Sequence, residues 1–131
     1  MVYGIGIDIV SLDKIRSICC KNIFLLKDNF FSENELRDAG IDESDGELTD
    51  EQIGSLASMF AAKEAAVKAI GLPFDVGFDW SDIVVSGKDN VTVETSGKIK
   101  KFISQIGIMR LTGSVSVSTA YSMAFIIGES K

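Results

Sequence analysis

The chain of 131 residues contains no histidine. Histidine is the side chain whose ordinary pKa places its charge change near neutral pH, and it is the commonest metal ligand in proteins. Its absence excludes Ser-His and Cys-His catalytic arrangements, histidine metal ligands and a histidine general base.

Cysteine is nearly absent as well, with only Cys19 and Cys20. Adjacent cysteines are poorly placed to bridge each other, and they form no metal-ligand spacing. We therefore expect a reducing compartment, the cytoplasm. The apolar N-terminal run is short and lacks a basic leader, so no signal peptide is expected, and no apolar run is long enough to span a membrane.

Basic residues are the minority charge. Thirteen lysines and arginines face 19 aspartates and glutamates, a net charge of −6, which argues against nonspecific binding to nucleic acids or anionic membranes. Lys14, Arg16 and Lys21 nevertheless make one segment locally basic. They form either an ordinary solvated helix face or a docking surface for an acidic partner.

The order of the expected elements indicates an α+β domain, with a long helix packed on a mostly antiparallel sheet. Length and a hydrophobic content of 46% predict a single domain over residues 1–131. Ser32 with Glu35, and Thr49 with Gln52, fit capping boxes at helix starts. The expected helices run from 11 or 12 to about 26, within 29–39 as a short helix capped by Ser32, from the Thr49 cap through 56–71 as the long helix, and over 96–108. The expected strands are 2–10, 80–86, 91–95, 114–118 and 121–128.

The rest of the chain is organised around the segment Leu56–Gly71. It is rich in alanine and contains no proline, so its helix propensity is high, and Gly71 followed by Pro73 ends it. At helical spacing one face carries Leu56, Met59, Phe60, Lys63, Val67 and Ile70. Lys63 is the one charged member of this apolar stripe.

The charges of this helix have two interpretations. In the first, Glu64 and Lys68 form a surface pair at i and i+4, and Lys63 buries its methylenes with its ammonium in water. In the second, Lys63, Glu64 and Lys68 line a cleft that binds phosphates and a metal ion.

The N-terminal segment Val2–Val10 is apolar and β-branched, as in a buried strand. Gly4 and Gly6 would let another backbone approach closely. Asp8 interrupts this strand, and an ionised carboxylate there is costly unless it is paired or bound to a metal. The alternative is that Asp8 lies at the strand end and pairs locally.

Asp8 and Glu64 converge if the long helix packs beside the first strand. Two carboxylates without histidine or thiolate suit magnesium, which completes its coordination with water and substrate phosphate. Lys63 and Lys68 would then face the phosphates as point charges. Phosphoryl-group transfer at such a site runs mainly on positioning and charge neutralisation, without a covalent nucleophile.

Two motifs resemble a known family. The sequence GIGIDIV of Gly4–Val10, followed by a helix, resembles the N-terminal signature of the holo-acyl-carrier-protein synthases, the AcpS-type phosphopantetheinyl transferases. Leu56–Gly71 (LASMFAAKEAAVKAIG) resembles their second signature, a phenylalanine-rich approach to Lys-Glu-Ala and a later Lys-Ala. The Asp-Ile pair after Trp80 and the last apolar strand, ending near Glu129, also match, so the resemblance covers nearly the whole chain.

The resemblance implies a reaction and its residues. These enzymes move the 4'-phosphopantetheine arm of coenzyme A onto a serine of an apo acyl carrier protein, releasing adenosine 3',5'-bisphosphate, in support of fatty acid biosynthesis. It implies that Asp8 and Glu64 hold magnesium against the pyrophosphate, with Lys68 as a third catalytic residue. The implied coenzyme A-binding residues are Lys63, Lys68, Phe60, which packs by the site, and Gly71, which allows close backbone approach. Either Glu64 or a water on the metal would be the general base.

The resemblance also implies partners. Carrier proteins of this class are acidic, so the helix with Lys14, Arg16 and Lys21 becomes the expected dock. The family forms homotrimers with the coenzyme A site between subunits. The apolar strands after Trp80 and at Met123–Ile127 are the expected interface material.

Four positions depart from the family pattern. Met59 replaces an arginine before the motif phenylalanine, and Lys14 replaces an arginine early in the first helix, keeping charge without the bidentate fork. Leu72-Pro73 replaces threonine-glycine, and the late hairpin at 115–121 reads as shortened and lacks a histidine common in relatives. The implied metal ligands remain, so these departures concern coenzyme A affinity more than reaction type. A relative that binds coenzyme A or a carrier protein without turnover, and an unrelated acidic interaction domain, are the competing hypotheses.

Overall fold

The strands form one five-stranded sheet. The computed structural model describes residues 1–19, 30–42, 46–73 and 75–131. The strands are β1 (Val2–Ser11), β2 (Ile83–Gly87), β3 (Asn90–Thr95), β4 (Ile108–Val117) and β5 (Tyr121–Ser130). Their spatial order is β1-β5-β4-β3-β2, and every neighbouring pair is antiparallel.

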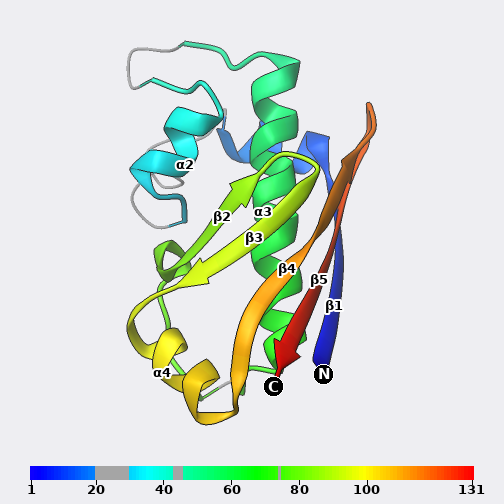
Figure 1. Ribbon diagram of the computed structural model, residues 1–131. Coiled ribbons are helices and arrows are strands. Elements are labelled where there is room, and N and C mark those ends of the chain that lie inside the picture. Colours follow the sequence, from blue (N-terminus) through cyan, green and yellow to red (C-terminus); the bar gives the residue numbers. More distant parts are fainter. Residues whose placement is uncertain (20–29, 43–45, 74) are drawn as a thin grey trace.

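One long helix, α3 (Asp50–Ile70), runs along one face of this sheet (Figure 1). Residues 12–19 are helical, and α2 (Glu33–Asp38), the 3-10 turn η1 (Trp80–Asp82) and α4 (Gly97–Gln105) complete the described elements. In Figure 1, α2 lies beside the N-terminal half of α3, and α4 lies near the other end of the sheet. None of the helices in the described ranges is long and apolar enough to cross a membrane.

The ends of the helices follow the sequence signals. Ser32 accepts from the Glu35 amide, and the Glu35 carboxylate accepts from the Ser32 amide, so the predicted capping box is confirmed. Thr49 and Gln52 make the same reciprocal pair at the start of α3. Gly71 ends α3 with φ 68°, a left-handed conformation that glycine adopts without steric cost.

Backbone contact between β1 and α3 holds the layers together. A methyl group added at Gly4 would meet the carbonyl oxygen of Ala69, and one at Gly6 would meet that of Ala65, both far inside van der Waals distance. The predicted close approach is therefore confirmed, and it depends on glycine in the strand facing alanine in the helix. This contact fixes the height of α3 over β1, on which the site described below depends.

The largest differences from the predicted boundaries lie in the second half of the chain. The segment 80–86 begins with the turn η1, and β2 starts only at Ile83. The helix expected over 96–108 ends at Gln105, because Gly107 takes φ 83° and Ile108 already pairs in β4. The strand expected from 114 thus begins six residues earlier, at Ile108. Residues 20–26 of the first predicted helix lie outside the described residues.

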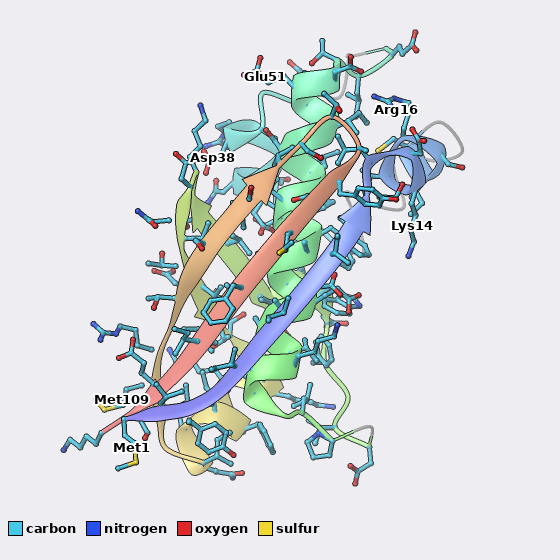
Figure 2. All side chains as sticks on the ribbon, turned by 90° about the vertical axis from the view of Figure 1, so that its right-hand side faces the viewer. Met1, Lys14, Arg16, Asp38, Glu51 and Met109 are labelled. Atoms are coloured by element: carbon cyan, nitrogen blue, oxygen red, sulfur yellow. The ribbon has the colours of Figure 1, made fainter. Side chains whose placement is uncertain are left out.

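The two faces of β1 differ sharply. Alternate residues point toward α3, including the buried Gly6 and Val10, while the other set points outward. Ile5, Ile7 and Ile9 are each more than half exposed. They face outward with Tyr121 and Met123 of β5, both about half exposed, on the side toward the viewer in Figure 2, which no described element covers.

The strands after Trp80 bury their apolar residues in the core. Ile83, Val85, Val91 and Val93 are all buried. The prediction that these strands are interface material is therefore wrong for these four side chains. In the Met123–Ile127 segment, Met123 is about half exposed.

Gly6→Ala is expected to destabilise the fold strongly. The added methyl would require the β1 and α3 backbones to separate, at a cost of about 3 kcal/mol in the free energy of unfolding, the upper end of what overpacking usually costs. Urea denaturation followed by circular dichroism measures it. Gly77→Ala is the matched control, because an added methyl there meets nothing within 4 Å. Equal stability of both variants would contradict the close-contact interpretation.

Candidate functional site

The inward face of β1 and one side of α3 bring three predicted residues together. Asp8 lies on the helix-facing side of β1, in mid-strand opposite Ala124, so it does not lie at a strand end. The ammonium of Lys68 lies 3.0 Å from Asp8 Oδ1 and donates also to the carbonyl oxygen of Ile7 at 3.1 Å. Glu64 lies one turn before Lys68 on α3.

The charge of Asp8 acts directly on Glu64. Burial, first, and the neighbouring Asp8 carboxylate, second, raise the pKa of Glu64, while Lys68 and Lys14 oppose that rise. Asp8, Glu64, Lys68 and Lys14 thus form one electrostatic group, although Asp8 and Glu64 are 56 positions apart. A carboxylate whose charge is disfavoured by burial and by a neighbouring carboxylate belongs to a donor set that a divalent cation would stabilise. The residues present therefore fit a magnesium ion.

Lys14 reaches this group from the helical turn after β1. Its ammonium lies over the ring of Phe60, 5.8 Å from the centroid. Phe60 and Glu64 are four residues apart on α3 and share a side of the helix. The expected docking residue Lys14 is therefore also a neighbour of the two carboxylates.

Arg16 points away from Lys14. It forms ion pairs with Asp13 at 3.2 Å and with Asp50 at 2.6 Å, at the start of α3. Figure 2 shows Arg16 directed toward the end of α3 where Glu51 lies, and Lys14 directed the other way. Lys21, the third expected docking residue, lies outside the described residues.

Lys63 occupies a different place from the one predicted. Its side chain has no exposed surface, and its ammonium donates to the Phe30 carbonyl at 2.6 Å, Glu35 Oε1 at 2.8 Å and the Trp80 carbonyl at 3.1 Å. An ammonium has three donors, and all three are used. The prediction that Lys63 contacts phosphate is thus wrong in this conformation, as is the alternative with its ammonium in water.

The partner of Lys63 is a residue that the sequence reasoning used only as a helix cap. Glu35 is buried, and its second oxygen accepts from the Val85 amide at 2.9 Å. Burial lowers the pKa of Lys63, and the charge and hydrogen bond of Glu35 oppose that change. A lysine in an apolar helix stripe requires a buried anion as partner. The position of Lys63 in that stripe was therefore the sequence signal that could have predicted a buried acidic residue such as Glu35.

The residue types at positions 71, 59 and 72 are explained by local structure. A methyl group at Gly71 would meet nothing within 4 Å, so no close contact within this chain requires glycine there. The positive φ of this residue is what favours glycine. Met59 is partly buried against the core. Leu72, which follows, is also partly buried against it.

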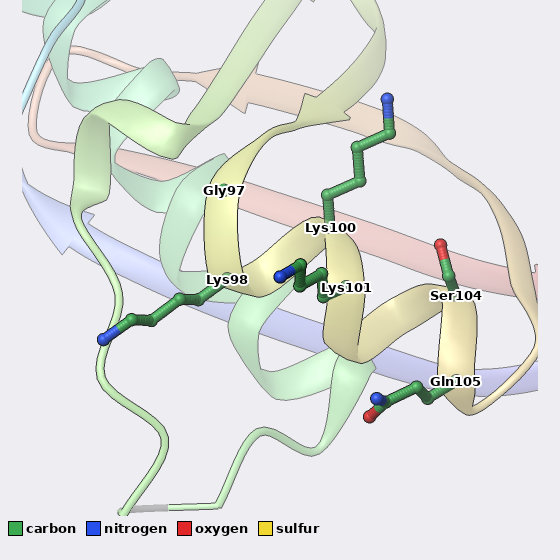
Figure 3. Close-up of a pocket in the computed structure, with 6 residues that line it drawn as sticks. All are labelled: Gly97, Lys98, Lys100, Lys101, Ser104 and Gln105. Atoms are coloured by element: carbon green, nitrogen blue, oxygen red, sulfur yellow. The ribbon is translucent and has the colours of Figure 1, made fainter.

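A separate surface hollow lies on α4. Its lining is Gly97, Lys98, Lys100, Lys101, Ser104 and Gln105, with the lysine side chains extending from one helix (Figure 3). None of the predicted site residues lines it, and it contains no carboxylate. It is therefore distinct from the Asp8–Glu64 group.

Glu64→Gln is expected to stabilise the metal-free protein at neutral pH. Because its folded pKa is raised, the carboxylate costs nothing below its ordinary value of 4.5, and its cost grows as pH rises through the folded pKa. Glu64 is only partly buried, so screening limits the gain to about 1 kcal/mol. Urea denaturation with a chelator at low and neutral pH measures the difference, with Glu94→Gln on exposed β3 as control. A larger gain at low pH would contradict the raised pKa.

Both the sequence and the fold are similar to known proteins. The family model described as the 4'-phosphopantetheinyl transferase superfamily matches residues 4–123. A holo-[acyl-carrier-protein] synthase of Herminiimonas arsenicoxydans is 32% identical, with 100% of both chains covered.

Solved structures agree with the fold. The holo-[acyl-carrier-protein] synthase of Neisseria meningitidis superimposes with a TM-score of 0.79 at 27% identity, covering 98% of this chain and 99% of the other. That of Bacillus anthracis, in complex with CoA (3',5'-ADP), gives 0.74 at 28% identity, covering 100% and 99%. The expected α+β transferase fold and enzyme class are confirmed. The chain belongs to the 4'-phosphopantetheinyl transferase superfamily.

Proposed function

We propose that this protein transfers the 4'-phosphopantetheine arm of coenzyme A to a serine of an apo acyl carrier protein. The products are the holo carrier protein and adenosine 3',5'-bisphosphate. The reaction would take place in the cytoplasm and support fatty acid biosynthesis. A single domain over residues 1–131 would catalyse it. The observation that carries the proposal is the convergence of Asp8, Glu64 and Lys68 from β1 and α3. The names of the relatives, and the CoA complex of the Bacillus anthracis enzyme, support the choice of substrates.

The reaction exchanges one phosphorus–oxygen bond for another. The serine oxygen of the carrier forms a bond to the phosphorus that bears the pantetheine arm, and the bond from that phosphorus to the bridging pyrophosphate oxygen breaks. Adenosine 3',5'-bisphosphate leaves with that electron pair, and the serine proton passes to a base. Among the residues of this chain, Glu64 is the candidate base, because its partly buried carboxylate lies beside Asp8 in the group that would face the phosphate.

Asp8 and Glu64 would hold magnesium, which when bound neutralises negative charge on pyrophosphate oxygens. Lys68 is half exposed and already bonded to Asp8, so its ammonium lies at the edge of the site, within reach of a phosphate oxygen. Gly71 follows at the end of the same helix, where it presents backbone without a side chain. Lys14 would meet the acidic carrier on the same side.

The exposed apolar face of β1 and β5 supports the proposal of a homotrimer. Ile5, Ile7 and Ile9 are 53%, 55% and 58% exposed and adjoin Met123 in the sheet. A contiguous apolar face of this kind is typical of subunit interfaces. Light scattering should give three times the chain mass, and a monomer at assay concentrations would contradict this.

One assay tests the function. The protein is incubated with coenzyme A, magnesium and an apo acyl carrier protein, and mass spectrometry measures the mass of the carrier. The proposal requires a gain equal to one phosphopantetheine arm. Binding of coenzyme A without a mass gain would instead identify a non-catalytic relative.

A further inference from the structure

Three aromatic rings form a stack beside the candidate site. Phe30 lies between the other two, with its ring centroid 4.7 Å from Phe60 at an interplanar angle of 15° and 4.8 Å from Trp80 at 29°. The rings come from the segment before α2, from α3 and from η1. We call Trp80, Phe30 and Phe60 the aromatic stack.

The ammonium of Lys63 holds two members of this stack by their backbones. It donates to the carbonyl oxygens of both Phe30 and Trp80, and it lies 5.2 Å from the Phe30 centroid. The third member, Phe60, lies one turn before Lys63 on α3. The third donor of Lys63 goes to Glu35, which is fixed in turn by the Ser32 and Val85 amides. Two of the three rings are therefore tied directly to one buried charge, and the third, Phe60, stacks on Phe30.

The outer member of the stack contacts Lys14. The Lys14 ammonium lies over the Phe60 ring, a cation–π arrangement, and its charge acts on Glu64. Lys14 is otherwise on a helix turn exposed to solvent, where a lysine side chain samples many rotamers. The Phe60 ring is thus the contact that holds its ammonium near the two carboxylates.

We propose that Lys63 is a positioning residue, whose buried ammonium fixes the aromatic stack so that Phe60 holds Lys14 beside Glu64, where it meets the acidic carrier protein. This inference rests on the proposed function for its kinetic consequence only. Its geometric part, the dependence of Lys14 on the stack, stands without it.

The geometric part is tested by NMR of the protein with its lysines ¹³C-dimethylated, Lys14 being assigned through Lys14→Arg. The ring of Phe60 should shift the Lys14 resonance away from those of solvated lysines. Phe60→Leu and Lys63→Met should each move it back, and the emission of Trp80, the only tryptophan, should change in Lys63→Met. Phe102→Leu on α4 is the matched control and should change neither signal. A Lys14 resonance unmoved in folded Phe60→Leu overturns the proposal.

The kinetic part uses the transfer assay. Phe60→Leu should raise KM for the apo carrier protein about two- to fivefold, the loss expected for one exposed cation–π contact, and leave KM for coenzyme A unchanged. The same change should add nothing in a Lys14→Ala background. A rise in KM for coenzyme A alone would assign Phe60 to direct substrate contact and overturn the positioning role. Absence of transfer by the unmodified protein would refute the proposed function, while the NMR result would still decide the geometry.

Discussion

Asp8→Ala and Glu64→Ala are each expected to abolish the mass gain of the carrier protein. Each removes one of the two carboxylates that converge between β1 and α3, and with it half of the proposed magnesium ligands. Loss of a preorganised charge at a phosphoryl-transfer site lowers turnover by about 100- to 1,000-fold or more. Mass spectrometry of the carrier after a fixed incubation measures the effect.

The interpretation requires that both variants fold. Glu64→Ala relieves like-charge repulsion, and Asp8→Ala loses only an ion pair with the half-exposed Lys68, so unfolding transitions should be close to that of the parent protein. Asp75→Ala and Glu94→Ala remove the same side-chain types from exposed positions and should retain full transfer. Full activity of either site variant would eliminate the two-carboxylate site.

Lys63→Met is expected to give the largest loss of stability. The methionine fills the space of the lysine stem, but it leaves the Glu35 carboxylate buried without its cation, and the Phe30 and Trp80 carbonyls without their donor. Breaking a buried ion pair by removing one partner costs about 3–5 kcal/mol in the free energy of unfolding. Urea denaturation, followed by far-ultraviolet circular dichroism, measures it.

A double variant that also changes Glu35 tests whether Lys63 and Glu35 act as a pair. Adding Glu35→Gln to Lys63→Met removes the unpaired charge and keeps an amide oxygen for the Ser32 or Val85 amide, so part of the lost stability should return. Lys98→Met, on the exposed side of α4, is the matched control and should change stability by less than about 0.5 kcal/mol. A destabilisation in the double variant equal to the sum of the single ones would mean that the two residues do not act as a pair.

The buried pair and the open site share neighbouring positions of one helix. Lys63 and Glu64 are adjacent in sequence, yet Lys63 points into the core while Glu64 lies near Asp8. Successive residues of a helix diverge by about 100° around its axis, so adjacent charges serve different environments. One turn of α3 therefore carries both the buried lysine Lys63 and the candidate site residue Glu64.

Local signals in the sequence determined the starts of α2 and α3, the end of α3 and the fold class. The two capping boxes and Gly71 involve residues at most four apart, so their chemistry is complete within the segment itself. Gly4 and Gly6 predicted a close backbone contact. The two motifs carried the family resemblance, which implies that Asp8 and Glu64 act together.

Tertiary structure alone decided what each charge faces. From the sequence Lys63 could be a surface lysine or a phosphate-binding lysine, because nothing in its own helix reveals Glu35, 28 positions away, or the Phe30 and Trp80 carbonyls. The partners of a buried ammonium are contributed by segments that meet only when the sheet and helices pack, since its desolvation must be compensated by whichever acceptors arrive there. The orientation of Lys14 over Phe60 and of Arg16 toward Asp50 follows from the same packing.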